Sequence, residues 1–270
     1  MIIKTNEVRN QAKTLEIQEG AHNQRVDNYL ITKLKSVTRS QVYRLIRTGQ
    51  VRVNSARIKP HYKLQAGDKL RIPPVKESTC TQSKAKPEQV KFLESRILYE
   101  DEGLIILNKP AGMAVHGGSG ISLGVIEALR VLRPNEENLE LAHRLDRDTS
   151  GCLLIAKRRK TLLWLHRLLR EGGMQKTYHT LVIGQWRGGN KVMLPLHKNQ
   201  LRSGERIVKV DTLEGKEAYT EFKILKSFEQ ATLLEAKPIT GRTHQIRVHT
   251  SYMGHPIVGD EKYGKRSENS

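Results

Sequence analysis

A polar segment divides this sequence into two parts that are expected to fold separately. It runs from Pro73 to Gln89, contains three prolines and has no apolar periodicity. Proline restricts the backbone and lacks an amide donor, so this composition is typical of a linker. The segments that follow from it are an N-terminal arm over 1–18, a small domain over 19–75, a linker over 76–92 and a larger domain over 93–270.

The chain is strongly basic, with 47 Lys and Arg against 28 Asp and Glu and a net charge of +19. Residues 1–75 hold fifteen of the basic and five of the acidic residues, which is about half of the excess. A field of this size attracts polyanions, so a nucleic acid is the predicted partner. The alternative is a basic surface that serves only solubility.

Several classes of protein are excluded by what the sequence lacks. It has no run near the roughly 18 apolar residues that cross a bilayer, and its first residues have no apolar signal-peptide core. Cys80 and Cys152 are too few for a disulfide framework or a four-cysteine zinc site. We therefore expect a cytoplasmic protein with free thiols and no membrane partner.

The small domain has the pattern of two helices followed by short strands. Val26, Leu30 and Leu34 recur every fourth residue and predict one helix face. Ser40 is the expected N-cap of a second helix over Gln41–Thr48, which Gly49 ends. Strands are predicted over 51–53 and 69–72.

A row of arginines follows the second helix and the next strand: Arg39, Arg44, Arg47 and Arg52. Such a row suits a phosphate backbone, although charge on a helix face is more often simple solvation. Residues 24–73 resemble the S4 RNA-binding domain, mainly through the Ser40–Asn54 pattern S-x-x-x-x-x-I-x-x-G-x-V-x-V-N. The resemblance implies a module that lies on structured RNA and reads shape and phosphates.

The larger domain is predicted to consist of many strands and few helices. A hairpin is expected around Gly103, helices over Ser122–Leu132 and Thr161–Arg170, and apolar strands on both sides of the polar loop Asp146–Ser150. A series of strands follows from Tyr178 onward. This order predicts an α+β domain on a mixed, largely antiparallel sheet.

The loop at Asp146 is the densest polar cluster, and its residues leave three interpretations open. Asp146 can be a structural turn residue. It can join His143, His244 and His249 in a metal site. It can also be a nucleophile or general base that nearby arginines keep charged.

A second cluster lies at Thr240–His249, after an apolar strand. Gly241 permits a tight turn and Thr243 is the expected cap of a helix. Arg242, His244 and Arg247 would then lie near the first turns of that helix and form an anion site. A phosphate and a catalytic carboxylate are both candidate partners.

Four segments resemble the RluA-type pseudouridine synthases: NKPAGMAVHGG from Asn108, HRLDRDTSG from His143, KTYHTLV from Lys176 and PITGRTHQIRVH from Pro238. The resemblance implies an S4-like domain followed by a catalytic domain that isomerises uridines of 23S ribosomal RNA, without metal or cofactor. We expect a monomer. The family continues well past the pattern Asp260-x-x-Tyr263-Gly264, so we expect a C-terminus shorter than the family's.

The resemblance also implies roles for single residues. Asp146 matches the family's essential aspartate, Tyr178 its active-site tyrosine, and Arg247 the basic residue that pairs with the aspartate. Ile246 matches the apolar residue beside that arginine, and Arg144 the arginine that fills the space of the flipped nucleotide.

Arg242 and His244 are expected to support this site. Asp146 is expected either to attack C1′ or to take a proton from C2′. Two other functions compete with the synthase. One is an RNA-binding assembly factor that has kept only the scaffold. The other is a metal-dependent nuclease that uses His143, Asp146 and His244.

Overall fold

The computed structural model describes residues 12–34, 37, 39–75, 86–117, 123–136, 138–200 and 206–264. The chain forms two compact units, Met1–Leu165 and His166–Ser270. Among the described residues, no helix is both long and apolar enough to span a bilayer.

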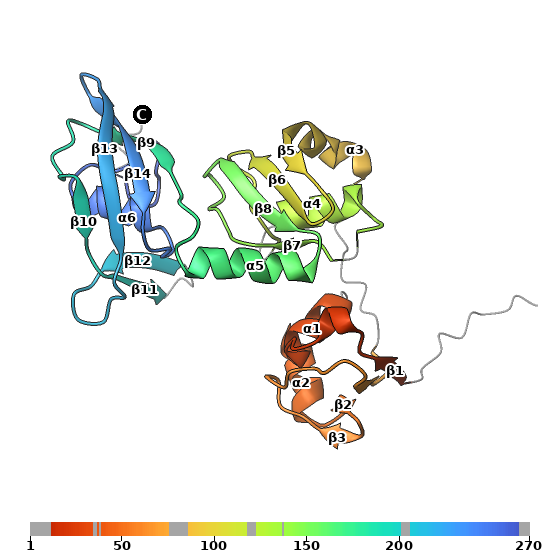
Figure 1. Cartoon of the computed structure of the whole chain (residues 1–270). Coiled ribbons are helices and arrows are strands. Elements are labelled where there is room, and N and C mark those ends of the chain that lie inside the picture. The colour runs from red at the N-terminus through yellow and green to blue at the C-terminus, as the bar shows by residue number, and fades with distance from the viewer. Residues whose placement is uncertain are drawn as a thin grey trace, which may run out of the picture. The chain divides into compact units, whose positions relative to one another are not determined.

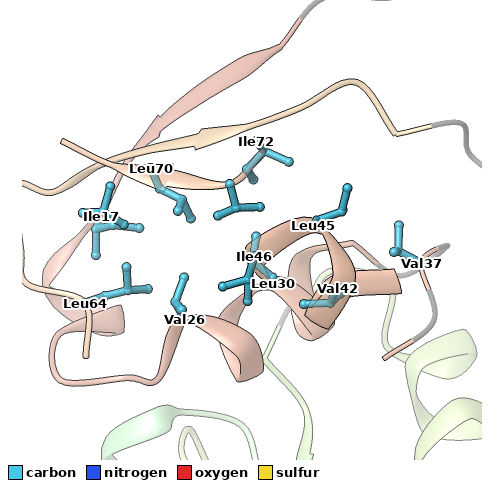
Figure 2. Close-up of a cluster of buried hydrophobic side chains, with 12 residues drawn as sticks. Ile17, Val26, Leu30, Val37, Val42, Leu45, Ile46, Leu64, Leu70 and Ile72 are labelled. Carbon is cyan, nitrogen blue, oxygen red and sulfur yellow. The ribbon is translucent and has the colours of Figure 1, made fainter. Parts of the chain in front are cut away.

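The described residues at the start of the first unit form a small domain of two α-helices, one antiparallel sheet and the short 3-10 helix η1 (Glu19–Ala21). The helices are α1 (Val26–Lys33) and α2 (Arg39–Arg47) (Figure 1). The strands, in sheet order, are β1 (Lys13–Glu16), β4 (Lys69–Ile72), β2 (Arg52–Val53) and β3 (Ala56–Arg57). Figure 2 shows how apolar side chains of both helices and the sheet meet in one core, among them Val26, Leu30, Val42, Ile46 and Leu70.

The domain differs from the prediction at three places. Helix α2 begins at Arg39, so Ser40 lies inside the helix and is not its cap. Helix α1 ends at Lys33, so Leu34 is its C-cap, although Leu34 packs against the same core as Val26 and Leu30. Strand β1 falls in the segment predicted as an arm, and Ile17 after it is buried in the domain core. The segment of β1 is only four residues long, which is too short for its polar and apolar alternation to predict a strand. The strand forms because its backbone pairs with β4.

The rest of the first unit is a second antiparallel sheet with short helices. Its strands, in sheet order, are β5 (Ile97–Glu100), β6 (Leu104–Lys109), β8 (Gly151–Ala156) and β7 (Glu140–Leu141). Its helices are α3 (Pro87–Val90), the 3-10 helix η2 (Lys91–Arg96) and α4 (Val125–Leu132). Helix α3 lies in the segment predicted as a linker. Helix α5 (Arg159–Arg170) spans the boundary between the two units.

The described residues of the second unit form the end of α5, a four-stranded antiparallel sheet, a hairpin and helix α6. The sheet order is β10 (Lys191–Met193), β13 (Tyr219–Ser227), β14 (Ala231–Pro238) and β9 (Tyr178–Ile183). Strands β11 (Leu196–Gln200) and β12 (Arg206–Val210) form the hairpin. Helix α6 (Gln245–Tyr252) follows β14 (Figure 1).

The α+β class and the largely antiparallel character of the sheets are confirmed. The hairpin around Gly103 forms as β5 and β6, and among the described strands every pairing is antiparallel. The strand before Asp146 is much shorter than predicted, because only Glu140–Leu141 pair with β8. The helix predicted over 122–132 begins at Val125, and residue 122 lies outside the described residues.

Asp27 is the polar centre of the small domain. Its side chain is fully buried and accepts hydrogen bonds from Arg25 at 2.6 Å, from the Tyr43 hydroxyl at 2.8 Å and from the Asn28 amide at 2.8 Å. Burial acts to raise the pKa of this carboxyl, but the three donors outweigh it and lower the pKa below its ordinary value. Tyr43 belongs to α2, so the same carboxylate ties α1 to α2.

We expect Asp27→Asn to make local unfolding of this small domain more frequent, while the rest of the chain stays unaffected. Hydrogen bonds to a charged group contribute roughly 2 kcal/mol, so amide hydrogen exchange in α1 and α2 should become about 30-fold faster at pH 7. Because the folded pKa is lowered, the contribution of Asp27 is present above about pH 4 and is lost as the pH falls further. Glu19→Gln, at an exposed acid of the same domain, is the control. Equal exchange in both variants would contradict this role.

Candidate active site

The pairing of β6 with β8 fixes where the Asp146 loop lies. In this antiparallel pair Lys109, the last residue of β6, is opposite Gly151, the first residue of β8. The loop Asp146–Ser150 comes directly before Gly151 in the chain. The end of one apolar strand therefore lies beside the loop that leads into its neighbour.

Lys109 binds this loop from inside the fold. Its side chain is fully buried, and its ammonium donates to the carbonyl oxygens of Pro110 at 2.7 Å, Met113 at 2.7 Å and Arg147 at 2.8 Å. Burial lowers the pKa of Lys109, while the charges of Asp148 and Asp146 act in the opposite direction. Three carbonyl acceptors match the three donors of an ammonium group, so Lys109 connects two loops through one buried charge.

The chain before Asp146 is held against β8 as well. The Leu154 amide donates to Nε2 of His143 at 3.1 Å, and the Ala142 amide donates to the Leu154 carbonyl at 3.0 Å. Leu145 is buried. Asp146 is thus positioned from both sides, by His143 upstream and by the carbonyl of Arg147 downstream.

The side chain of Asp146 is half-buried, and Arg144 beside it is exposed. The Asp146 carbonyl accepts a hydrogen bond from the Thr149 amide at 3.2 Å, which closes a turn. The backbone of Asp146 therefore forms a turn. Because this bond uses the main-chain oxygen, it does not compete with chemistry at the carboxylate.

In the second unit, helix α6 presents Arg247 in a fixed orientation. Its Nε donates to Asp260 at 2.7 Å and its Nη2 donates to the other carboxylate oxygen at 2.9 Å. The guanidinium also lies 5.0 Å from the ring centroid of Tyr263. Burial acts to raise the pKa of Asp260, but the hydrogen bonds and charge of Arg247 and the amides of Tyr263 and Lys262 lower it. A bidentate pair fixes the guanidinium plane as well as its position.

The start of α6 differs from the expected capping. Thr243 is not the cap, because His244 occupies that position in the left-handed region with φ 54°. Nδ1 of His244 lies 2.7 Å from the Tyr263 hydroxyl. The Gln245 side chain accepts from the Arg242 amide at 3.0 Å and donates to the Tyr219 carbonyl at 2.9 Å, so it joins the turn to β13.

Tyr178 and Ile246 border the same hydrophobic cluster. Tyr178 begins β9 and pairs with Ala236 of β14, and Ile246 lies in the first turn of α6. Both are partly buried against this core, whose buried members are Val182, Trp186, Val192, Phe222, Leu234 and Ala236. The second unit therefore brings the predicted tyrosine and the predicted apolar neighbour of Arg247 to one core.

The other predicted binding residues have mixed surroundings. Arg44 and Arg47 are exposed on α2, whereas the side chain of Arg39 lies outside the described residues. Arg52 is half-buried and donates to the carbonyl of Gly49 at 3.1 Å. Nε of Arg242 donates to the Glu217 carbonyl at 3.0 Å. Arg52 thus stabilises the turn before it, whereas Arg242 connects its turn to the segment before β13.

The histidines considered as metal ligands have protein partners. His249 is buried, with its ring nitrogens 2.9 Å from the Thr220 hydroxyl and 3.1 Å from the Leu194 carbonyl, and burial lowers its pKa. Within the described residues, the group whose ligand atoms are close enough for a metal is different: it consists of His197, Asp211 and Glu214.

Sequence reasoning missed Lys109, Asp260 and Gln245 as positioning residues. A local signal for Lys109 is its position at the end of an apolar strand, although lysine side chains are rarely fully buried. Asp260 and Gln245 give no such signal, because their partners are set by tertiary contacts.

We expect Lys109→Met to destabilise the first unit by about 3 kcal/mol, because it leaves buried carbonyl oxygens without their charged donor. Urea unfolding of the full chain measures this loss. Lys91→Met, at an exposed lysine, should stay within about 0.5 kcal/mol of the original chain. If the two variants unfold at the same urea concentration, Lys109 does not have this role.

Comparison with known proteins identifies the family of each of the two parts of the chain. The family model for RNA pseudouridylate synthases matches residues 103–252, and the S4 domain model matches residues 24–70. The chain is 57% identical to the ribosomal large subunit pseudouridine synthase C of Pasteurella multocida, over 97% of this chain and 82% of the relative. It is 55% identical to the protein of that name from Escherichia coli K12, over 94% and 80%.

Solved structures agree with this result. Human RNA pseudouridylate synthase domain containing 4 aligns with a TM-score of 0.57 at 27% identity, over 67% of this chain and 74% of the other. Human RNA pseudouridylate synthase domain containing 1 aligns with a TM-score of 0.54 at 27% identity, over 64% and 70%. The chain therefore belongs to the RNA pseudouridylate synthase family and carries an S4 domain before its synthase domain.

Proposed function

We propose that this chain converts specific uridines of large-subunit (23S) ribosomal RNA to pseudouridine, with Asp146 as the catalytic carboxylate. The observation that carries the proposal is the Asp146 loop, which a buried lysine and a strand-bound histidine position in a chain of this family. The names of the bacterial relatives support the ribosomal substrate. The S4 domain and the net charge of +19 are consistent with a large, polyanionic RNA substrate.

The reaction places clear demands on the protein. The bond between N1 and C1′ breaks, the uracil turns, and C5 bonds to C1′ while the C5 proton is lost and N1 gains one. The reactants and products have the same composition, so no redox partner is consumed. The base must leave the stack, because C1′ and both base edges have to be reached. A carboxylate serves both open routes, attack at C1′ or removal of the C2′ proton.

We infer partners for Asp146 from the matched residues. Arg247 would pair with the carboxylate and direct it, because its two hydrogen bonds to Asp260 fix the plane of the guanidinium. Tyr178 would stack on the uracil beside Ile246, since both border one core. Arg144, exposed before Asp146, would fill the space of the extruded nucleotide. Arg242 and His244 would support this arrangement, and Arg39, Arg44, Arg47 and Arg52 would lie along the RNA backbone.

The cytoplasm, where ribosomal RNA is assembled, is the proposed location, and a monomer is the proposed state. Neither a metal nor a cofactor is proposed to take part.

Asp146→Asn should abolish tritium release from ribosomal RNA labelled with [5-³H]uridine, because the amide can neither attack nor accept a proton. We expect a fall on the order of 10³-fold or more, with RNA affinity changed by less than about threefold. Asp148→Asn is the matched control, since Asp148 is exposed in the same loop. Tritium release by the Asp146 variant above a tenth of the original rate would overturn the assignment. If the unsubstituted chain binds RNA but releases no tritium, the protein is an RNA-binding factor and not a synthase.

Asp260→Asn should lower the single-turnover rate by roughly 10- to 100-fold while RNA affinity stays within about threefold, because Arg247 loses the partner that orients it. Glu261→Gln, at the exposed neighbour, should leave the rate unchanged. A rate loss that is accompanied by an equal loss of RNA affinity would show that Asp260 acts only on binding or folding.

A further inference from the structure

Helix α5 combines an exposed aromatic ring with basic residues in a way that neither the catalytic residues nor the S4 domain explains. Its sequence from Arg159 to Arg170, RKTLLWLHRLLR, contains no acid. Leu162 and Leu165 are buried, which fixes the face that packs against the protein. Trp164 is 56% exposed, an unusual state for the largest apolar side chain.

Two of the four residues one helical turn from Trp164 are cationic, and the other two are Thr161 and Leu168. Lys160 lies four residues before Trp164 and Arg167 lies three residues after it, so all three share one side of the helix. Both basic residues are exposed. Arg167 pairs with Glu171 at 3.0 Å, and both members of that pair are solvated, so a phosphate can compete for the guanidinium.

We propose that this face of α5 is a second RNA-binding site, in which Trp164 stacks on an unpaired base and Lys160 and Arg167 contact the flanking phosphates. An aromatic platform between cations is the chemistry that binds single-stranded nucleic acid, because every base has a π-face and every nucleotide carries a charge. The inference rests on the proposed function only in that the substrate is RNA.

The site would have a purpose distinct from that of the S4 domain. Extruding one base from a structured RNA also removes a stacking partner from each of its neighbours. A platform that stacks one of these bases would stabilise the opened RNA, whereas a module that reads duplex shape would not. The site thus selects for unpaired nucleotides.

Fluorescence gives a direct test, because the chain has two tryptophans and Trp186 is buried. The full chain is titrated with a single-stranded oligouridylate of twelve nucleotides and with an RNA duplex of equal length. The Trp164→Leu variant supplies the emission of Trp186 alone. We expect the single strand to quench the Trp164 component and the duplex to leave it nearly unchanged, since paired bases are not available for stacking. Equal quenching by both RNAs, or by neither, would overturn the proposal, and the latter result would point to a protein partner for this face.

Affinity for a large-subunit ribosomal RNA transcript provides the second readout. Trp164→Leu should weaken binding roughly tenfold and Trp164→Phe by less than about threefold, because phenylalanine keeps a stacking surface. Leu163→Ala is the matched control, at a residue of the same helix that is 51% exposed and has no π-face. Lys160→Gln and Arg167→Gln should each reduce the salt dependence of binding by about one unit in the log–log slope, and Glu171→Gln should strengthen binding.

The two proposals can fail separately. If tritium release persists in the original chain but Trp164→Leu binds the transcript as well as Leu163→Ala does, the stacking site is wrong and the synthase assignment stands. If the original chain binds RNA through Trp164 but releases no tritium, the catalytic proposal is wrong and the binding site stands.

Discussion

The buried ammonium of Lys109 is the interaction on which the catalytic loop depends. A charge without solvent has to be matched by local acceptors, and here the acceptors are three main-chain carbonyl oxygens from two loops. One of them belongs to Arg147, the residue after Asp146. The hydrogen bonds that stabilise the buried charge therefore also restrain the backbone next to the candidate nucleophile. A flexible loop could not hold the carboxylate in one position.

Two other buried charged groups in the chain also orient neighbouring polar residues. In the small domain the buried group is the carboxylate of Asp27, and its donors join two helices. In the second unit it is the carboxylate of Asp260, which orients Arg247. In each case a charged side chain inside an antiparallel or helical framework fixes a neighbouring polar group, so the positioning residues are more deeply buried than the residues they position.

Much of the organisation could be predicted from the sequence, because long apolar periodicities and a nine-residue motif carry it. The hairpin before Lys109, the helix that begins at Arg159 and the family itself were all predictable from local pattern. Strand β1 and the start of α6 were not, since one depends on pairing with β4 and the other on the side chain of Gln245. The roles of Lys109 and Asp260 also depend on contacts between residues far apart in sequence, which a single sequence does not reveal.

The central claim is that this chain makes pseudouridine in large-subunit ribosomal RNA. The most direct test is to map pseudouridines along that RNA in cells that lack the protein, and in the same cells supplied with it. The account predicts that specific pseudouridines disappear in the first sample and return in the second. An identical set of pseudouridines in both samples would contradict it.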